Sequence, residues 1–577
     1  MANNKQLNVK AKNRRKVVRT ILEVIAIMAA AFFVVKSVFF LYHYDEPKAT
    51  ANNSKQGFVA ISYFGVDRSG STKHIGREQL AKQLTLLKEQ GFTTISQQQI
   101  IDFYEKGTPL PEKALFLSFE DGRTDSSIFS QSTLEKLNFK ATMFTYADNT
   151  QSKDNKFLTT GDIQSMVDSG YWEHGTNGNH LSYINAYTPN GDYLGEVPEN
   201  AVTDKTKIEY YNHFLMDYLR DEHMIPKETV EKMDMRLTNE YTNMKKMYTK
   251  DGGTLPKAYA IMHANAMYNT MDDMVEKVNE RNIHNLFSLH FNTNYRAYND
   301  AKQDVYNLNR MQVAPYWATN HMLMKMKDES AIPIEFTVGD KKLAADWLVE
   351  QGRGEFTKQD IILTSEVDKE VSATLTKKWP AQAIVSADFN GAVMGTQSMT
   401  LSDGTVSAKV SLQKNKLLIQ TQNGSKKGQL QKMNLQELDW KNEDYAFGKA
   451  SNYTYLQTQE GSRVDKTAYP SNVMNNRDVR IQAVGERLII TVDGKEYKAH
   501  LPKELHDFAL TLSGEALASD TEKEQFVDTI YDAFFGDVTV TKNREVLYST
   551  RASAPERALD AAKKQYDNVV DFFIHTF

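Results

Sequence analysis

The sequence predicts an α/β domain with a mainly parallel sheet, followed by an all-β domain. In the first half, short apolar runs alternate with amphipathic helical patterns, which is typical of parallel strands joined by crossover helices, either in an open sheet or in a closed barrel. Past Ala331, short alternating runs separated by turn residues replace the helical patterns, which indicates an antiparallel β-sandwich. At 577 residues the chain is long enough for two such cores.

The N-terminal segment predicts a membrane anchor. A basic tail, residues 1 to 20, precedes an apolar stretch from residue 21 to 42, and a helix of that length spans about 30 Å, the apolar thickness of a bilayer. The positive charges favour a cytoplasmic N-terminus, with a single pass through the cell membrane and the bulk of the chain outside. A cleaved signal peptide is the alternative, because Ala49-Thr-Ala51 has the small-x-small form.

Composition excludes several classes of function. The formal net charge is only -5, and no long basic run occurs outside the N-terminus, so nucleic acid is not expected as a partner. The chain has no cysteine, which excludes disulfides, thiol nucleophiles and cysteine-ligated zinc.

The first half of the chain supplies the predicted strands in order after a linker at residues 43 to 55. An amphipathic helix is expected from Arg77 to Gln90, with Leu80, Leu84 and Leu87 on one face. The run Leu115 to Phe119 is continuously apolar, which suits a strand covered on both faces. The expected strands are Phe58 to Phe64, Phe92 to Ser96, Leu115 to Phe119 and Ala141 to Tyr146.

Two carboxylates, Glu120 and Asp121, stand where this apolar run ends. Because alternate strand residues point to opposite faces, both acids can face one site only if Asp121 has left the strand, and Gly122 supplies that turn. The carboxyl ends of parallel strands are where such a domain builds its site. A metal that activates a water, beside a carboxylate that takes its proton, would hydrolyse an amide or an ester. A solvated turn without chemistry is the alternative.

The motif Ser118-Phe-Glu-Asp-Gly122, followed after a helix by Lys140-Ala-Thr-Met-Phe144, resembles the polysaccharide deacetylases. The first motif of that family is Thr-Phe-Asp-Asp-Gly, and the resemblance covers residues 56 to 327. It implies a distorted (β/α) barrel of deacetylase type that removes N- or O-acetyl groups from cell-surface glycans with a divalent metal, zinc or similar. It also implies that Glu120 is the general base and Asp121 a metal ligand.

The segment from Gly170 to His180 resembles the second motif region of the family, in which two histidines bind the metal. In the matching register their places are taken by Asn177 and Leu181. Leucine cannot bind a metal, and an asparagine oxygen suits calcium or magnesium better than zinc. Two outcomes therefore stay open: a metal site rebuilt from other histidines, and a site that works without metal or is catalytically silent.

Other side chains are candidates for the same site. His290 stands near the end of the predicted strand Asn285 to Phe291 and is a candidate acid or ligand. Arg310 is expected to pair with carboxylates around the strand ends. The candidate catalytic residues are Glu120, Asp121 and His290; the candidate substrate-binding residues are Arg123, Asn177 and Arg310; the candidate metal ligands are Asp121, His174 and His180, with help from His263 or His290.

Three further segments complete the predicted organisation. Residues 200 to 250 are expected as a helical insertion near the mouth of the barrel. Residues 328 to 550 are expected as the sandwich, in which Asp493-Gly494 predicts a tight hairpin, and the order of its features resembles the concanavalin-type (laminin G-like) fold, which is much used to bind glycans. Residues 551 to 577 carry a capping-box pattern and a helical apolar spacing, which predict a C-terminal helix.

Three functions fit these observations. The leading one is a membrane-anchored polysaccharide deacetylase-like hydrolase that acts on an amino sugar of a cell-wall polymer or an exopolysaccharide. The second is a glycan-binding or polysaccharide-assembly protein that keeps the barrel without the metal chemistry. The third is a glycosidase that uses Glu120 with another carboxylate. The expected partners are the glycan, the membrane through the N-terminal helix, and glycan synthases or exporters.

Overall fold

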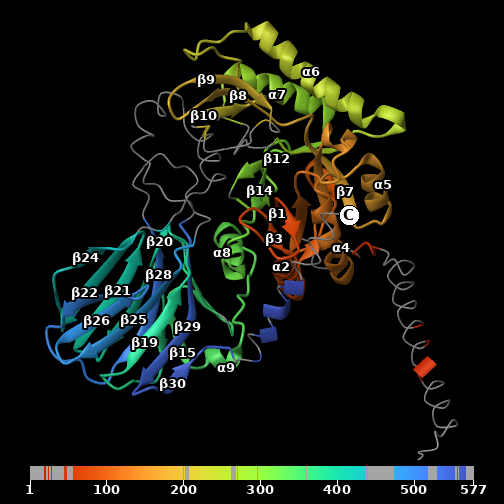
Figure 1. Cartoon of the computed structure of the whole chain (residues 1–577). Helices are drawn as coiled ribbons and strands as arrows, with labels where there is room; N and C mark the ends of the chain where they lie inside the picture. Colours follow the sequence, from red (N-terminus) through yellow and green to blue (C-terminus); the bar gives the residue numbers. More distant parts are fainter. Residues whose placement is uncertain are drawn as a thin grey trace, which may run out of the picture.

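The structure is a computed structural model, and two folded bodies dominate it (Figure 1). The predicted membrane span at residues 21 to 42, apart from Val24 and Met28, and most of the predicted helix at 551 to 577 lie outside the described residues. Within the described part of the chain, no helix is long and apolar enough to cross a membrane. The structure describes residues 44–47, 56–198, 207–208, 210–261, 271–294, 296–358, 360–436, 474–517 and 529–552, with isolated positions at 201, 268, 438 and near both ends.

A closed parallel barrel forms the first body. Its strands follow one another in the order β1-β14-β12-β11-β7-β6-β5, and β5 returns to pair with β1 in parallel, which closes the sheet. Short flanking strands, β4 (Thr93–Thr94) and β13 (Tyr298–Asp300), pair with β5 and β1. The prediction of a parallel sheet is confirmed, in its closed form. The barrel strands are β1 (Gly57–Tyr63), β5 (Ala114–Phe119), β6 (Ala141–Tyr146), β7 (Trp172–Gly178), β11 (Ala258–Tyr259), β12 (Leu289–Asn294) and β14 (Leu308–Gln312).

Helices cover the outside of the barrel. Leu80, Leu84 and Leu87 of α2 are buried against it, as their spacing predicts. Ser96 and Gln99 form a capping box at the start of α3, which fixes the turn between β4 and that helix. The helices are α2 (Arg77–Glu89), α3 (Gln97–Lys106), α4 (Thr124–Leu137), α5 (Thr160–Asp168), α7 (Asp273–Leu286) and α8 (Thr319–Glu329).

The insertion near the mouth of the barrel is only partly helical. Three strands, β8 (Ser182–Tyr187), β9 (Tyr193–Pro198) and β10 (Tyr210–His213), form an antiparallel sheet, and α6 (Val230–Tyr248) follows it. The first four residues of the tyrosine-rich segment, Tyr210 to His213, therefore form a strand where a helix was expected, because aromatic side chains favour a pleated surface that buries them against neighbouring strands. Figure 1 shows this sheet with α6 and α7 at the top of the barrel.

The second body is a pair of antiparallel sheets, which confirms the all-β prediction. Each sheet has eight strands, and their apolar faces enclose one shared core. Asp493 and Gly494 both have positive φ, 50° and 79°, and join β26 to β27 by the predicted two-residue turn. The longest strands are β20 (Gly395–Ser402), β21 (Val406–Gln413), β22 (Lys416–Asn423), β25 (Arg477–Val484), β28 (Ala509–Ala516) and β29 (Asp532–Lys542), with β26 (Arg487–Val492) and β27 (Lys495–His500) beside β25.

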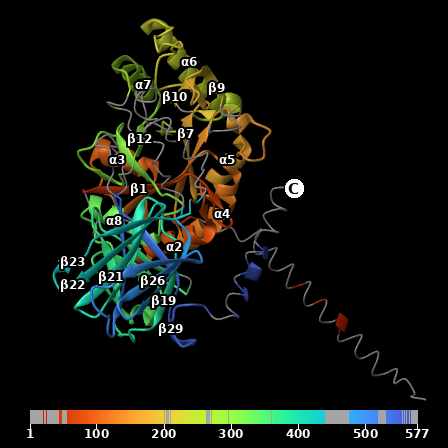
Figure 2. The ribbon, with the colours of Figure 1, turned by 60° about the vertical axis from the view of Figure 1, so that its left-hand side comes forward.

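The sandwich lies against the α2 and α8 side of the barrel (Figure 2). The buried Asp532, at the start of β29, makes the main polar contact: its Oδ2 accepts from the backbone N of Ala318 at 2.9 Å and lies 2.8 Å from Nδ1 of His321. Thr364 Oγ1 donates to the other oxygen of Asp532 at 2.6 Å. One aspartate of the sandwich thus binds the first turn of the helix that ends the barrel.

Candidate functional site

The acid pair follows the carboxyl end of β5, inside the ring of barrel strands. Glu120 still takes part in the sheet, since its N donates to Tyr63 O at 3.1 Å. Asp121 then leaves the strand with a φ of 67°, a left-handed conformation that is uncommon for a residue with a side chain. At Gly122 an added Cβ would lie 2.9 Å from the Thr145 side chain, so the turn that the sequence predicts needs glycine here.

Glu120 is fully enclosed and its carboxylate is held by three side chains. Oε1 accepts from Arg310 Nε at 2.6 Å and from Ser62 Oγ, and Oε2 accepts from Asn177 Nδ2 at 3.0 Å. Glu120 and Arg310 are each 1% exposed, and Arg310 Nη1 also donates to the backbone oxygens of Phe291 and Asn292. A charge-assisted pair of this kind is strong because a buried carboxylate keeps a fixed counter-charge.

Asn177 occupies the place of the first expected histidine and connects the two acids. Its Nδ2 donates to Glu120 and also to Ala260 O at 3.1 Å, while its Oδ1 accepts from the backbone N of Asp121 at 3.4 Å. Both ends of the amide are therefore used within the protein. Its oxygen faces a backbone donor and not a position where a cation would sit.

Asp121 and Arg123 lie together beside this network. Asp121 Oδ2 is 3.6 Å from Arg123 Nη1, and the two side chains are 10% and 14% exposed. They are the predicted site residues that retain some contact with solvent at the acid pair. An acceptor beside a donor suits the hydroxyl and acetamido groups of an amino sugar.

The predicted histidines are not gathered at the acid pair. His174 lies 2.9 Å from Thr145 Oγ1 through Nε2, and burial lowers its pKa to about 4. His290 is 0% exposed, its Nδ1 donates to Tyr306 O at 3.0 Å, and burial lowers its pKa to about 3. Both imidazoles are therefore neutral at neutral pH.

His180 lies elsewhere, on the loop after β7. Its Nδ1 is 2.5 Å from Glu240 Oε1, a residue of α6, and the hydrogen bond to that carboxylate raises the pKa of His180. Asn179 Nδ2 donates to the same Glu240 oxygen at 3.0 Å. The ring is thus held by the insertion rather than by the acid pair.

The described residues do not fit the metal that the resemblance implies. Within the ranges that the structure describes, no three histidine, aspartate or glutamate side chains come together as a metal site needs. Asn177 uses both amide groups within the protein, and Leu181 has no donor atom. His263 lies outside the described residues.

Two residues that bind predicted site residues, Ser62 and Glu240, were not identified from the sequence. Ser62 is a small polar residue in the otherwise hydrophobic run of β1, and a polar residue in a buried run is a signal that could have found it. Glu240 lies in an amphipathic helix among many charged residues, and no local pattern separates it from them.

No family model matches the chain. A stretch of 69 residues, 11% of the chain, is 38% identical to the poly-beta-1,6-N-acetyl-D-glucosamine N-deacetylases of Escherichia coli strain K12 and of Escherichia coli O157:H7. The match spans only 10% of the length of these relatives.

Several solved structures are similar to parts of the chain. A de-N-acetylase from Aggregatibacter actinomycetemcomitans is 17% identical over 47% of this chain and 99% of its own, with a TM-score of 0.35. IcaB from Ammonifex degensii is 18% identical over 45% of this chain and 93% of its own, with a TM-score of 0.32. The carbohydrate binding module CBM66 from Bacillus subtilis is 12% identical over 34% of this chain and 96% of its own, with a TM-score of 0.23.

The features of the barrel agree with the sequence match. The strand-end motif stands at the carboxyl end of a closed parallel barrel, and the curated relatives are N-deacetylases. Over these 69 residues the chain is therefore similar to N-deacetylases of a poly-N-acetylglucosamine.

Proposed function

We propose that this protein engages an acetylated amino-sugar polymer, of a cell wall or an exopolysaccharide, outside a membrane to which residues 21 to 42 anchor it. The observation that carries the proposal is the Glu120 and Asp121 pair at the carboxyl end of β5, where Arg310 holds Glu120 in place. The name of the curated relative, a deacetylase of a poly-N-acetylglucosamine, supports this class of polymer. Glycan synthases or exporters are natural partners of an anchored protein of this kind.

The geometry favours binding of the polymer over metal-dependent hydrolysis. A general base must contact the proton that it takes, whereas Glu120 is 1% exposed and accepts hydrogen bonds from three side chains. His290, the candidate acid, is neutral and donates its proton to a backbone oxygen. Asp121 and Arg123, which keep some exposure, are the residues that would contact the polymer.

Metal-dependent deacetylation is the second candidate. The order of the two acids matches the family, and the sequence match is to N-deacetylases. A bound divalent metal would supply an activated water. This function requires ligands beyond those that the structure describes, and His263 is the first to test.

One experiment separates the two candidates. The full-length protein, purified in detergent, is assayed for bound metal, for binding to N-acetylated glucosamine polymer, and for acetate release, beside Asp121→Asn. We expect saturable binding that Asp121→Asn weakens, without acetate release. Stoichiometric metal and acetate release that Asp121→Asn abolishes would establish the deacetylase. Absence of both binding and release would overturn both candidates.

A variant with two added histidines tests whether Asn177 and Leu181 are the reason that the described residues do not fit a metal. Asn177→His combined with Leu181→His restores the histidine pattern of the family. If these substitutions removed an ancestral metal site, the variant should retain zinc where the parent does not. Asn190→His together with Leu181→His is the matched control, because Asn190 is exposed on the loop between β8 and β9.

A further inference from the structure

The side of α6 that lies against the barrel carries Glu240, Met244 and Tyr248, each four residues after the one before it. Residues at this spacing fall on one side of a helix. All three are buried, with exposed fractions of 8%, 1% and 7%. They contact the carboxyl ends of β6 and β7 or the loop after β7, at the same end of the barrel as Glu120.

The Tyr248 hydroxyl joins the ends of two neighbouring barrel strands. It lies 2.7 Å from Thr145 Oγ1 in β6 and 3.0 Å from Thr176 Oγ1 in β7, and it donates to the backbone oxygen of Thr145 at 2.9 Å. Burial raises the pKa of Tyr248, so the hydroxyl keeps its proton. The ring of His174 lies edge-on to that of Tyr248, with 5.1 Å between centroids. One side chain of the insertion thus connects β6 to β7.

The helix also holds the chain on both sides of Asn177. Before this residue, Thr176 Oγ1 lies 3.7 Å from Met244 Sδ. After it, Asn179 Nδ2 donates to Glu240 Oε1 at 3.0 Å. The residue that connects the two acids of the site therefore stands between two points of contact with the insertion.

The turn that carries Asp121 rests on the same two segments. Its backbone N donates to Asn177 Oδ1 at 3.4 Å, and Gly122 packs on Thr145, whose Cγ2 would lie 2.9 Å from an added Cβ at that glycine. Asp121 has a φ of 67°, and a left-handed backbone at a residue with a side chain persists only where its surroundings hold it. Thr145 and Asn177 are such surroundings, and α6 contacts the segments of both.

Another side of α6 is held by α7. Tyr241 OH donates to Asn279 Oδ1 at 2.8 Å, and Arg281 Nη1 donates to Asp234 Oδ2 at 3.0 Å. Figure 1 shows the two helices together at the top of the barrel. Because α7 is one of the helices that cover the barrel, these bonds fix α6 in place over the strand ends.

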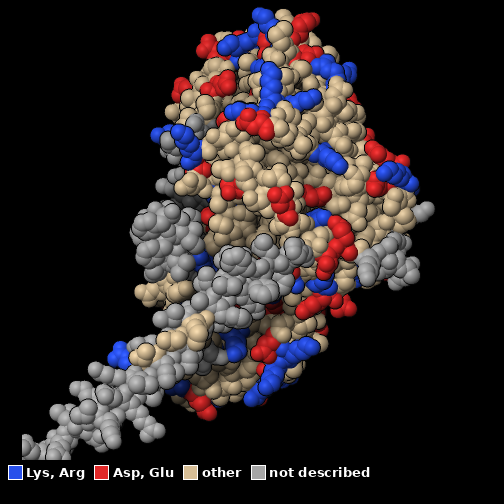
Figure 3. All heavy atoms as spheres, turned by 90° about the vertical axis from the view of Figure 1, so that its right-hand side faces the viewer, with Lys and Arg blue, Asp and Glu red and all other residues tan. Residues whose placement is uncertain are grey.

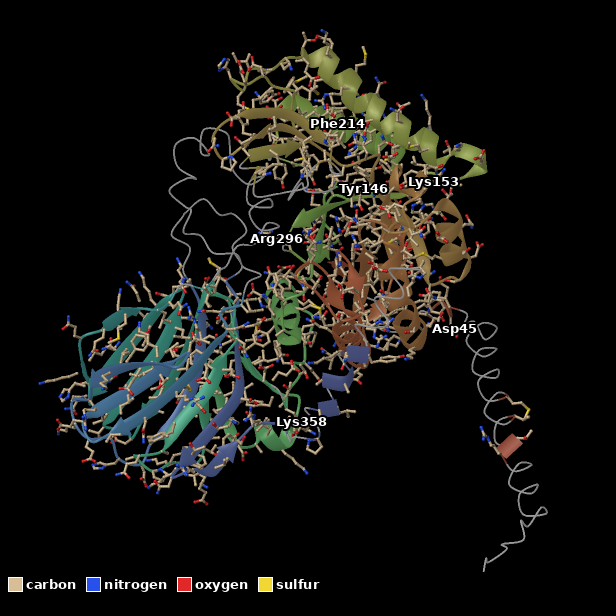
Figure 4. The ribbon with its side chains drawn as sticks, in the orientation of Figure 1. Asp45, Tyr146, Lys153, Phe214, Arg296 and Lys358 are labelled. Atoms are coloured by element: carbon tan, nitrogen blue, oxygen red, sulfur yellow. The ribbon has the colours of Figure 1, made fainter. Side chains whose placement is uncertain are left out.

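The second half of α6 turns polar side chains to the solvent. Its exposed residues are Asn239, Thr242, Asn243, Lys245 and Lys246. Figure 3 shows basic and acidic side chains interspersed over the end of the molecule where Figure 1 places α6. Figure 4 labels Tyr146, the last residue of β6, below Phe214 of the insertion. The buried side of the helix is therefore the side that contacts the barrel and α7.

We propose that α6 positions Asp121 for the polymer, with Tyr248 as the positioning residue. The Tyr248 hydroxyl holds Thr145 and the end of β7, and these hold the turn that carries Asp121. This inference rests on the proposed function, in which Asp121 and Arg123 contact the polymer. The Tyr248 hydroxyl is enclosed between two strands, so its effect on binding passes through Asp121.

The first test removes the Tyr248 hydroxyl and keeps the ring. Tyr248→Phe in the full-length protein, purified in detergent, is assayed for binding to N-acetylated glucosamine polymer, beside Tyr241→Phe. This control removes a buried hydroxyl of the same helix, but one whose acceptor is Asn279 of α7. We expect Tyr248→Phe to weaken binding by about 3- to 10-fold and Tyr241→Phe to leave it unchanged.

The dependence on Asp121 is tested in a second background. Asp121→Asn already weakens binding, and the addition of Tyr248→Phe should then change it by less than about 2-fold, because the group that Tyr248 positions is gone. A general loss of structure would instead weaken binding by the same factor in both backgrounds.

A second variant tests the same contact from the barrel side. Thr145→Val removes the hydroxyl beside Tyr248 and keeps a methyl group against Gly122. It should weaken binding as Tyr248→Phe does, and the two together should weaken it no further than either alone. Two losses that multiply would show that the effect of Tyr248 does not pass through Thr145, and would overturn the inference.

Hydrogen exchange follows the Asp121 turn without the polymer. Exchange at the amides of residues 120 to 123, measured by mass spectrometry, should become faster in Tyr248→Phe and in Thr145→Val, because the turn is held less firmly. In Tyr241→Phe it should stay as in the parent.

The outcomes separate the inference from the proposed function. Where the parent binds the polymer, unchanged binding in Tyr248→Phe, an equal loss in Tyr241→Phe, or an equal loss in the Asp121→Asn background would each overturn the inference alone. A parent that does not bind, with exchange that responds to Tyr248→Phe and not to Tyr241→Phe, would overturn the proposed function, while the support of Asp121 by α6 would stand.

Discussion

A glutamate lies at each end of the barrel, and the two carboxylates have different hydrogen-bond partners. At the carboxyl end Glu120 accepts from Arg310, Ser62 and Asn177. At the amino-terminal end Glu173 accepts from the backbone N of Gln97 at 2.8 Å, and burial raises its pKa to about 7. Lys140 and Lys257 only moderate that rise.

The difference lies in the partners that each carboxylate has within the protein. A fixed guanidinium and two further donors replace the water that Glu120 has lost. A single backbone donor with distant lysines does not do so for Glu173. Glu120 is therefore part of a hydrogen-bonded network, whereas the amino-terminal end of the barrel contains a group that titrates near neutral pH.

The largest effect is expected from breaking the Glu120 network at its counter-charge. Arg310→Met leaves the buried Glu120 carboxylate without its counter-charge, and we expect a loss of about 3 to 5 kcal/mol in the free energy of unfolding. Denaturant unfolding measures it. Glu120→Gln with Arg310→Met should recover part of the loss, and a loss below about 1 kcal/mol for Arg310→Met alone would show that the pair is not isolated from water.

The second effect concerns Glu173 and depends on pH. Because its folded pKa of about 7 exceeds the ordinary 4.5, the folded state binds more proton than the unfolded state between these values, so stability falls as pH rises through them. At pH 8 Glu173→Gln should be more stable than the parent by about 2 to 3 kcal/mol, and near pH 4 the two should be equal.

Thermal unfolding at the two pH values checks this difference. The exposed Glu89→Gln is the control, and it should follow the parent at both. If the Glu173→Gln gain were the same at both pH values, titration of Glu173 would not be its cause.

A smaller effect is expected when Glu120 loses one neutral donor. Asn177→Ala removes the bond to Glu120 Oε2 and the acceptor of the Asp121 N, and we expect a loss of about 1.5 kcal/mol. The measurement is again denaturant unfolding, with the exposed Asn190→Ala as control. A loss as large as that of Arg310→Met would make the amide, and not the charge pair, the centre of the network.

The smallest effect is expected in the segment from Tyr44 to Glu46, where Asp45 N donates to Asn138 Oδ1 at 3.0 Å. Glu46 is 64% exposed in its pair with Lys140, so Glu46→Gln should cost no more than about 1 kcal/mol. Hydrogen exchange at the Asp45 amide should nevertheless become faster, because this segment is held less firmly. Unchanged exchange would mean that Asn138 alone holds the segment.

Much of the fold follows from local patterns. The apolar run of β5 and the turn at Gly122 are visible in the sequence because a fully buried strand needs continuous apolar residues and a left-handed turn needs glycine. The strand β10 was not predicted because its tyrosines are followed by charged residues, and this pattern fits a helix as well as a strand. Only pairing with β8 decides between them.

The sequence predicts the two acids of the candidate site but not the side chains that bind them. Glu120 directly follows the carboxyl end of β5, where a parallel barrel builds its site, and Arg310 lies within β14. The side chain of Asn177 is oriented by Glu120 and Asp121, and the ring of His290 by the carbonyl of Tyr306. These partners are distant in the sequence, so no local pattern shows them. The contact between Asp45 and Asn138 could not be predicted for the same reason, since Asn138 lies 93 residues beyond Asp45.

The contact made by Asp532 has a consequence for the order in which the protein is completed. This carboxylate binds the first turn of α8, yet it lies 211 residues after His321. A growing chain therefore finishes the barrel long before the residue that caps its last helix exists. Truncation after residue 517, within the sandwich, would remove the carboxylate that binds Ala318 N and His321, so damage to the last strands should destabilise the barrel.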